Sequence, residues 1–230
     1  MAVIKTIRGL YKFKQVDLYL GKKQINKEIA KVNLLDIKKI LDKGNLYYGL
    51  IFGVLLGAIR EHDFITHDQD TDLFILSEDE EKFKLLLFEM QELGFNLIRY
   101  DRRGLYSVIR DGEYIDFYVF QPFQKGIRYS GSDYVLEKHL TRTIKINFQG
   151  EEFRIPADYI EFLEIYYGYD WQTPIIWSTY NLSKFKIIRE KIIVKLKRAL
   201  PKTIFKWLQF IHAKKKRDRF FYRIKNRSLN

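Results

Sequence analysis

The 230-residue sequence contains no cysteine, only four prolines and only four histidines. Without cysteine the chain forms no disulfides, thiolate zinc sites or iron–sulfur clusters, and it has no cysteine nucleophile. The histidines are scattered and form no HExxH or other close metal-binding pattern; they are His62, His67, His139 and His212. These absences exclude sulfur chemistry and give no sign of a histidine-based metal site.

Long apolar segments are also missing. The longest uninterrupted run of apolar residues and glycine spans residues 46–59, whereas a membrane-spanning helix needs about 20 residues. This run contains three glycines, and we expect it to form buried core. The first residues, MAVIKTIRGLYKFK, lack the apolar stretch of a secretory signal. The sequence therefore predicts a cytoplasmic protein.

Apolar residues are nevertheless plentiful, at 47% of the chain with 18 Phe and 16 Tyr. That content supports a substantial core and argues against a disordered chain. The length corresponds to one domain, or to one domain with an appendage.

The net charge of +12 is unevenly distributed. Residues 182–230 hold 17 Lys and Arg and 2 acids, whereas residues 1–181 hold 24 basic and 27 acidic groups. We therefore predict a nearly neutral catalytic or binding domain at residues 1–181 and a basic helical tail at residues 182–230 that acts as an electrostatic anchor. Nucleic-acid binding is disfavoured because the body carries no basic excess.

The periodicity of apolar residues predicts a mixture of helices and strands. Asp111-Gly112 and Gln149-Gly150 indicate hairpin turns, and Pro156 is expected in the first turn of a helix. Pro201 should interrupt the basic tail. We expect helices at 24–43, 53–60, 78–93, 156–167, 182–200 and 203–211, and strands at 46–52, 70–76, 105–110, 114–120, 143–148 and 152–155.

Alternating carboxylates are the most informative feature. In Asp68-Gln-Asp70-Thr-Asp72, Asp70 and Asp72 project to the same face of the predicted strand, and Asp68 joins them if the strand starts early. Carboxylates that close repel each other unless a cation compensates, and Mg²⁺ suits oxygen ligands and phosphate substrates. Asp116, the lone charge in an apolar strand, is a candidate third acid from a neighbouring strand.

Other interpretations of these residues remain open. An acidic turn of this kind can be solvated or bind calcium weakly, although the EF-hand pattern does not fit. Asp116 could be a capped structural group. Gly53 and Gly57 could let backbone N–H groups approach phosphate at a helix start. Arg60 could contact a substrate phosphate or form an ordinary ion pair.

The segment GVLLGAIREHDFITHDQDTDLFIL resembles the signature of the LicD-type phosphotransferases, relatives of fukutin and fukutin-related protein. Two further blocks, around Asp116 and in residues 155–174, resemble later elements of the same family, so the resemblance covers about residues 24–180. The matching residues of the first block are Gly57, Ala58, Arg60, Phe64, Ile65, Asp68, Asp70 and Asp72.

The resemblance implies an α+β, nucleotidyltransferase-like fold with a mixed sheet flanked by helices. It also implies transfer of a phospho-substituent, such as phosphocholine or a polyol phosphate, from a CDP-activated donor to a sugar hydroxyl of a surface glycan or its lipid-linked precursor. The implied cofactor is Mg²⁺ or Mn²⁺. The implied metal residues are Asp68, Asp70, Asp72 and Asp116, with Asp116 alternatively accepting the hydroxyl proton; the implied phosphate-binding residues are Gly53, Gly57 and Arg60.

The sequence also departs from the family pattern. Phe52 stands in place of the first of two paired glycines, Val54 in place of a threonine, and Thr66-His67 in place of Pro-Trp. None of these departures removes the alternate acids Asp68, Asp70 and Asp72. We therefore expect them to affect which donor is bound. His67, Tyr167 and Trp171 are candidate substrate contacts, although aromatic residues at such density usually pack a core.

The basic tail suits an anionic membrane surface, with Trp207, Lys214, Lys215, Lys216 and Arg217 as candidate contacts. A solvated helix that packs one face on the domain is the alternative. We therefore expect a transferase that is peripheral on the inner membrane face. A nucleotidyltransferase that uses a nucleoside triphosphate and a binding protein with decayed chemistry are the competing interpretations.

Overall fold

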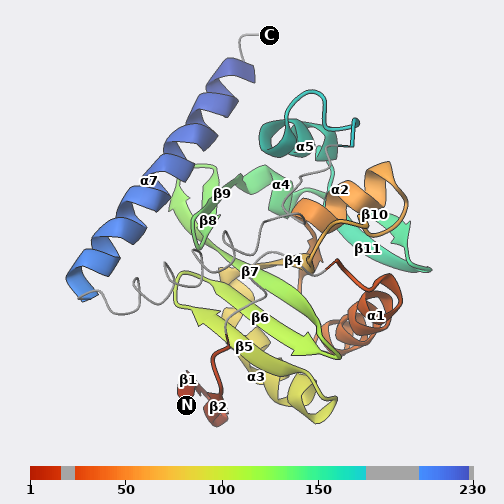
Figure 1. The fold of residues 1–230 in the computed structure, drawn as a ribbon, viewed down its shortest axis with the longest axis vertical. Coiled ribbons are helices and arrows are strands. Elements are labelled where there is room, and N and C mark those ends of the chain that lie inside the picture. The colour runs from red at the N-terminus through yellow and green to blue at the C-terminus, as the bar shows by residue number, and fades with distance from the viewer. Residues whose placement is uncertain (17–23, 175–201, 228–230) are drawn as a thin grey trace, which may run out of the picture.

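A mixed seven-stranded sheet forms the centre of the protein in the computed structural model, which describes residues 1–16, 24–174 and 202–227 (Figure 1). Its main path runs β3-β4-β7-β6-β5, and β8 and β9 extend it from β7. Only β4 and β7 are parallel; the other pairs are antiparallel. The strands are β3 (Tyr48–Leu50), β4 (Asp70–Leu76), β5 (Asn96–Asp101), β6 (Leu105–Arg110), β7 (Glu113–Gln124), β8 (Ile127–Ser130) and β9 (Asp133–Leu136).

Helices cover both faces of this sheet. On one face, Phe83 of α3 (Glu80–Glu92) packs against Tyr106 and Phe117, and α1 (Lys27–Lys43) lies beside α3. Tyr118 points to the opposite face because side chains alternate along a strand. There it meets Phe52, the first residue of α2 (Phe52–Arg60), and α5 (Tyr159–Tyr167) lies against α2.

Local sequence explains where these elements begin and turn. The Asn26 side chain caps α1 by accepting a hydrogen bond from the N–H of Ile29 at 3.2 Å. Asp111 and Gly112 both have positive φ, at 51° and 81°, which matches the two-residue turn predicted between β6 and β7. Gln149 and Gly150 form the corresponding turn between β10 (Thr143–Phe148) and β11 (Glu151–Pro156).

The structure confirms an α+β fold built on a mixed sheet flanked by helices. One detail of the sequence prediction is wrong: Pro156 does not lie in the first turn of a helix. It pairs with Thr143 as the last residue of β11, so α5 begins only at Tyr159. Five strands and one short helix were not predicted: β1 (Ala2–Thr6), β2 (Gly9–Phe13), β5, the β8–β9 pair and α4 (Glu137–Thr141).

The basic C-terminal segment forms one continuous helix, α7 (Lys202–Arg227), which packs on the body. Phe220 is buried against Ile127 and Ile165. Lys216 pairs with Asp133 at 2.7 Å, and Arg227 pairs with Glu164 at 2.8 Å. The helix predicted at 182–200 and the domain boundary predicted at residue 181 lie outside the described residues. Within the described parts of the chain, no helix is long and apolar enough to cross a membrane.

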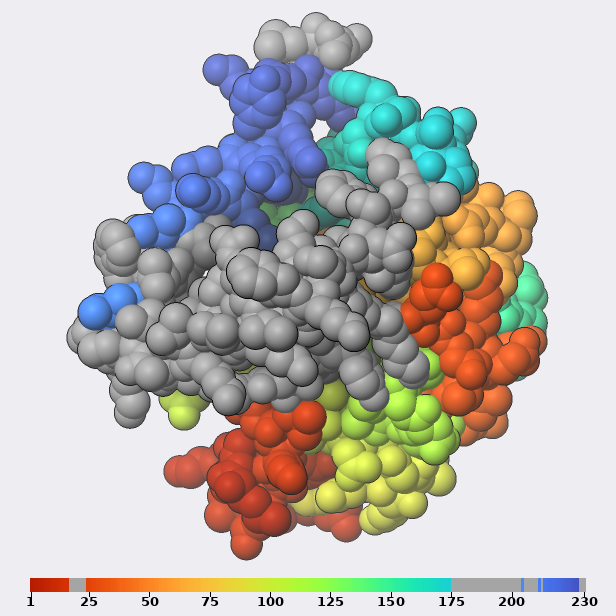
Figure 2. Space-filling model, viewed as in Figure 1, coloured from red at the N-terminus to blue at the C-terminus, as the bar shows by residue number. Residues whose placement is uncertain are grey.

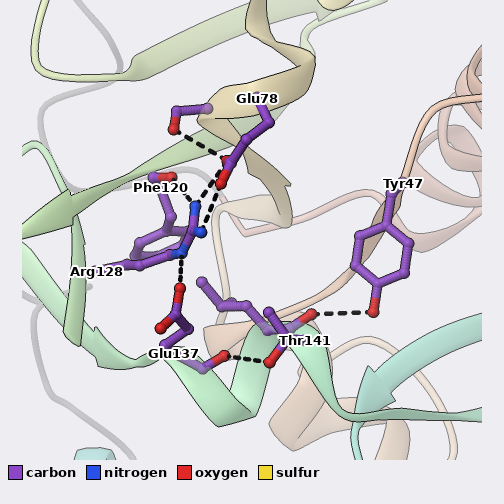
Figure 3. Close-up of polar contacts among 8 residues, drawn as sticks. Tyr47, Glu78, Phe120, Arg128, Glu137 and Thr141 are labelled. Carbon is purple, nitrogen blue, oxygen red and sulfur yellow. Dashed lines mark hydrogen bonds and ion pairs between the residues drawn. The ribbon is translucent and has the colours of Figure 1, made fainter. Parts of the chain in front are cut away.

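A buried arginine on β8 links three elements through ion pairs. Figure 3 shows Arg128 between Glu78 and Glu137, which it contacts at 2.6–2.7 Å and 2.8 Å. Arg128 is 7% exposed, and its guanidinium holds the pKa of Glu78 down to about 2. The two carboxylates satisfy a charge that would be costly to bury alone, which fixes α4 and the 3-10 turn η1 (Ser77–Asp79), just before α3, against β8.

A buried histidine makes stability sensitive to acid. His139 is 1% exposed, and burial together with the neighbouring Lys138 lowers its pKa to about 3. Its Nε2 lies 3.0 Å from a Glu161 carboxylate that also pairs with Lys138 and with Arg227, so that carboxylate's negative charge is already compensated.

We therefore predict a loss of stability below neutral pH that depends on His139. The unfolded ring binds a proton near pH 6.5 and the folded ring near pH 3, so the free energy of unfolding falls as the pH drops between those values. At pH 5 the loss is about 2 kcal/mol. Urea unfolding gives the free energy of unfolding at pH 7.5 and at pH 5. The decrease between the two pH values should be smaller in His139→Gln than in the unchanged protein, by about 2 kcal/mol. An equal difference in both proteins would contradict the assignment.

Candidate active site

Three carboxylates converge where the parallel strands β4 and β7 meet. Asp70 and Asp72 lie on the same face of β4, and Asp72 is directly opposite Asp116 of β7. One carboxylate oxygen from each residue lies within 4.8 Å of the others. Asp72 and Asp116 are 6% and 2% exposed. The structure thus brings together three of the four acids that the sequence singled out, and Asp68 is not in this group.

The electrostatics of this cluster are unfavourable without a cation. Burial raises the pKa of Asp70 and Asp72 well above the ordinary value, and repulsion from the neighbouring carboxylates raises them further. Burial also raises the pKa of Asp116, although Arg99 and Ser107 oppose that effect. Three hard oxygen ligands with mutually repelling charges form a donor set that fits a divalent cation such as Mg²⁺. The residues present therefore fit a metal ion.

A row of polar side chains continues from this cluster across the sheet. Cross-strand neighbours place Asp116 beside Ser107 of β6, and Ser107 beside Arg99 of β5. The Ser107 hydroxyl donates to Asp116, and Arg99 donates to Asp116 through Nη2 and to Ser107 through Nε, the latter at 2.8 Å. Both oxygens of Asp116 are therefore held, and one positive charge offsets part of the cluster.

An irregularity in β5 aims Arg99 at the site. The pairing of β5 with β6 shifts between Leu97 and Arg99, which leaves Ile98 as an extra residue. Side chains alternate along a strand, so without that bulge Arg99 would lie on the same face of the sheet as Leu97. Ser107 lies on the other face, and Arg99 could then not reach it. Bulges commonly redirect a side chain in this way.

A cavity of about 420 Å³ opens beside the carboxylates. Asp68 and Asp70 form part of its wall, and Arg223 reaches it from α7. Arg223 also donates from Nη1 to the carbonyls of Ile165 and Tyr166, both at 2.8 Å, at the end of α5. The remaining lining residues are Gly53, Leu56, Arg60, Ile65, His67, Gln69, Tyr166, Tyr167, Trp171 and Thr173.

The start of α2 packs tightly against this cavity. The Gly53 N–H donates to Asp72 at 3.2 Å, and a Cβ on Gly53 would lie only 2.2 Å from Asp68 Oδ2. A larger residue there would displace the Asp68 carboxylate. The preceding Phe52 has φ of 51°, a conformation that costs roughly 1–3 kcal/mol in a residue other than glycine. Its ring packs against Tyr118 and Tyr166 at 4.9 and 5.0 Å between centroids, which holds this backbone in place.

The other predicted site residues occupy different positions. Asp68 lies before β4 and outside the three-carboxylate group, on the cavity wall. Gly57 faces the loop at residues 63–65, where a Cβ would lie 2.5 Å from the carbonyl oxygen of Asp63. Arg60 donates to the Trp171 carbonyl at 3.1 Å and pairs with Glu61 at 2.7 Å. His67, Tyr167 and Trp171 all line the cavity.

Sequence reasoning missed Arg99, Ser107, Tyr166 and Arg223. Ser107 carried a usable signal, because it is the only small polar residue in a predicted strand, just as Asp116 is the lone charge in the next one. Arg99 and Arg223 gave no such signal, since a bulge directs the first and the docking of α7 directs the second.

Comparison with known proteins now identifies the family. The sequence profile described as LicD/FKTN/FKRP, nucleotidyltransferase domain, matches residues 45–164. The chain belongs to this LicD family. The matched region contains α2, the three carboxylates of β4 and β7, and most of α5.

Two curated relatives of this LicD protein are uncharacterized proteins of Rickettsia. One, from Rickettsia typhi (strain ATCC VR-144 / Wilmington), is 32% identical over 85 residues, which is 37% of this chain and 26% of the relative. The other, from Rickettsia prowazekii (strain Madrid E), is 36% identical over 67 residues, or 29% of this chain and 25% of the relative. The chain therefore matches about a quarter of the length of each.

Two of the solved structures that are similar in fold to this LicD protein are nucleotidyltransferases. A lincosamide antibiotic adenylyltransferase, LnuA, bound to lincomycin, has a TM-score of 0.44 at 9% identity, covering 72% of this chain and 94% of the other. ANT(2″)-Ia in complex with adenylyl-2″-tobramycin has a TM-score of 0.43 at 13% identity, covering 83% and 98%.

We predict that Asp72→Asn has opposite effects on stability in the absence and in the presence of metal. Removing one buried negative charge should raise the free energy of unfolding of the metal-free protein by on the order of 1 kcal/mol. The same change should abolish stabilisation by Mg²⁺ or Mn²⁺, which in the unchanged protein reaches about 2.7 kcal/mol at 100 times the dissociation constant. Melting curves in EDTA and in each metal measure both effects.

Asp36→Asn, on α1 and away from the sheet's polar row, is the matched control and should keep the metal response. A protein whose melting temperature ignores both metals would contradict the assignment of the metal site.

Proposed function

We propose that this LicD-family protein transfers a phospho-substituent, phosphocholine or a polyol phosphate, from a CDP-activated donor to a sugar hydroxyl. The observation that carries the proposal is the convergence of Asp70, Asp72 and Asp116 within 4.8 Å at the edge of a cavity large enough for a small donor. Family membership supports a transferase that uses an activated phosphate. The acceptor would be a surface glycan or its lipid-linked precursor.

The proposed reaction is a displacement at phosphorus. The acceptor hydroxyl oxygen forms a bond to the donor's distal phosphorus, the bond from that phosphorus to the bridging oxygen breaks, and CMP leaves with the bond's electron pair. The hydroxyl proton passes to a base. The products are the phosphodiester-linked sugar and CMP. Catalysis of such a step consists chiefly of positioning and charge stabilisation.

The residues divide these tasks. Asp70, Asp72 and Asp116 would hold Mg²⁺ or Mn²⁺, which supplies neutralisation of charge at the donor phosphates. Because Ser107 and Arg99 hold both oxygens of Asp116, Asp116 suits a fixed ligand better than a mobile base.

Asp68 suits the role of proton acceptor. It lies on the cavity wall and outside the three-carboxylate group, so its carboxylate need not hold the metal and would serve as the general base. Gly53 and Arg60 line the same cavity and would face the donor phosphates. Gly57 would support them indirectly, by letting the loop at 63–65 approach α2.

A donor panel tests this proposal. In Mg²⁺, one CDP-alcohol among CDP-choline, CDP-ribitol and CDP-glycerol should raise the melting temperature, because a ligand at 100 times its dissociation constant adds about 2.7 kcal/mol. Asp70→Asn should lose the shift and Asp36→Asn should keep it. Transfer is then measured as CMP release on adding acceptor glycan.

The other arms of the panel contain ATP and a UDP-sugar. A shift with ATP alone would replace the proposal by a nucleotidyltransferase that uses a nucleoside triphosphate. Metal binding without a response to any donor would count against transfer and favour a binding protein.

We also propose that α7 docks on an anionic membrane surface, which would place the protein at the cytoplasmic face. Lys214 and Lys215 are exposed, whereas Lys216 is engaged with Asp133 and Arg217 lies beside Asp218. Trp207 belongs to the same helix. Basic residues near such a surface each contribute about 1 kcal/mol, so these two exposed lysines would strengthen the attraction.

The matching prediction is that Lys214→Gln/Lys215→Gln weakens sedimentation with phosphatidylglycerol vesicles by about fivefold per lysine. Lys39→Gln/Lys145→Gln removes two exposed lysines from elsewhere and should have little effect. Equal binding by both double variants would count against docking through α7.

A further inference from the structure

The β1–β2 hairpin presents an outward face that mixes apolar and cationic side chains. Its inner face is buried: Ile4, Tyr11 and Phe13 are 3%, 2% and 6% exposed, and Tyr11 packs edge-on against Phe88 of α3. The backbone continues to β5, where the Val16 N–H donates to the Ile98 carbonyl at 2.9 Å. Among the residues that the structure describes, the hairpin is therefore anchored through its inner face, at one end of the molecule (Figures 1 and 2).

Apolar and cationic side chains alternate on the outward face, both along each strand and across the strand pair. Val3 lies opposite Lys12, and Lys5 lies opposite Leu10. Val3 is 48% exposed and Leu10 is 56% exposed, and both lysines are exposed as well. Each apolar side chain thus has a cation across the strand and another two residues along it.

The turn adds the most exposed apolar side chain of the hairpin. Ile7 and Arg8 form the two-residue connection between Thr6 and Gly9, and Ile7 is 80% exposed. Such turns usually carry Gly, Asn or Asp. Here Gly9 has the positive φ, at 126°, so the backbone gives no reason for isoleucine at the tip.

The charge of the hairpin has one sign. Lys5, Arg8, Lys12 and Lys14 are exposed, and the first 16 residues contain no acid. Arg8 also lies over the Phe88 ring, 5.0 Å from its centroid, which holds its charge at the edge of the hairpin that faces α3. A surface with apolar side chains ringed by cations complements an anionic lipid bilayer, whose headgroups meet the lysines while its upper acyl region receives the apolar groups.

Other occupants fit less well. Nucleic acids are bound through stacking on aromatic side chains in addition to charge, and the hairpin's aromatic residues, Tyr11 and Phe13, face inward. A second copy would bring two faces of like charge together, and lysines on exposed strands oppose such pairing.

We propose that the outward face of the β1–β2 hairpin docks on an anionic lipid bilayer, with Ile7 entering the interface. This surface is separate from α7 and from the three-carboxylate site, so the proposal goes beyond the proposed function and does not depend on it.

A single fluorescent label tests the proposal. Because the chain has no cysteine, Ile7→Cys gives a unique position for an environment-sensitive dye such as NBD. Val32→Cys, on α1 and 56% exposed, is the control position. With vesicles of phosphatidylcholine and phosphatidylglycerol, the dye at position 7 should shift to the blue and brighten, and the dye at position 32 should not change. Vesicles of phosphatidylcholine alone should give no response at either position.

A second pair of variants tests the charge. Lys5→Gln/Lys12→Gln should weaken vesicle binding by about fivefold per lysine, whereas Lys39→Gln/Lys145→Gln should not, with circular dichroism confirming that both fold. Sedimentation with vesicles while the dye at position 7 stays silent would place the contact elsewhere, for example on α7, and would overturn the proposal. Absence of binding, or equal responses to neutral and anionic vesicles, would also overturn it. Donor binding is measured separately, and its outcome leaves this result unaffected.

Discussion

The parallel pairing of β4 with β7 is the constraint on which the candidate site depends. That register sets Asp72 directly opposite Asp116, while alternation along β4 adds Asp70 to the same face. Burial then makes the concentrated negative charge costly, because each carboxylate loses water and gains a repelling neighbour. A divalent cation would relieve this cost by compensating the negative charge, so under the proposed function the stability lost in the empty site is recovered when the metal binds.

The rest of the sheet reduces that cost without removing it. Ser107 and Arg99 extend the row from Asp116 to the outer strand, which leaves the cluster with one compensating cation and with Asp116 fixed in orientation. On the other side of the cluster, Phe52 holds a positive φ so that α2 can start close to Asp72. The aromatic contacts of Phe52 offset the strain at the position where a glycine would be relaxed.

Sequence patterns predicted those parts that depend on local periodicity. The strand at Asp70–Leu76 and the Asp111-Gly112 turn follow from alternation and turn chemistry, and Asp116 was a candidate as the lone charge in an apolar strand. Its position directly opposite Asp72 is set by the pairing of β4 with β7. Arg99 could not be predicted, because one extra residue in β5 reverses its direction, and no pattern marks that bulge. Pro156 was misplaced because the pairing of β11 with β10 overrides the preference of proline for a first helical turn.

The most direct test of the account is a crystal structure of the protein soaked in Mn²⁺, with data collected at the manganese absorption edge. The account predicts one anomalous peak between the carboxylates of Asp70, Asp72 and Asp116, at oxygen distances of about 2.0–2.2 Å, as for a small hard cation. A peak held by other residues, or none at this position while Mn²⁺ saturates the crystal, would contradict it.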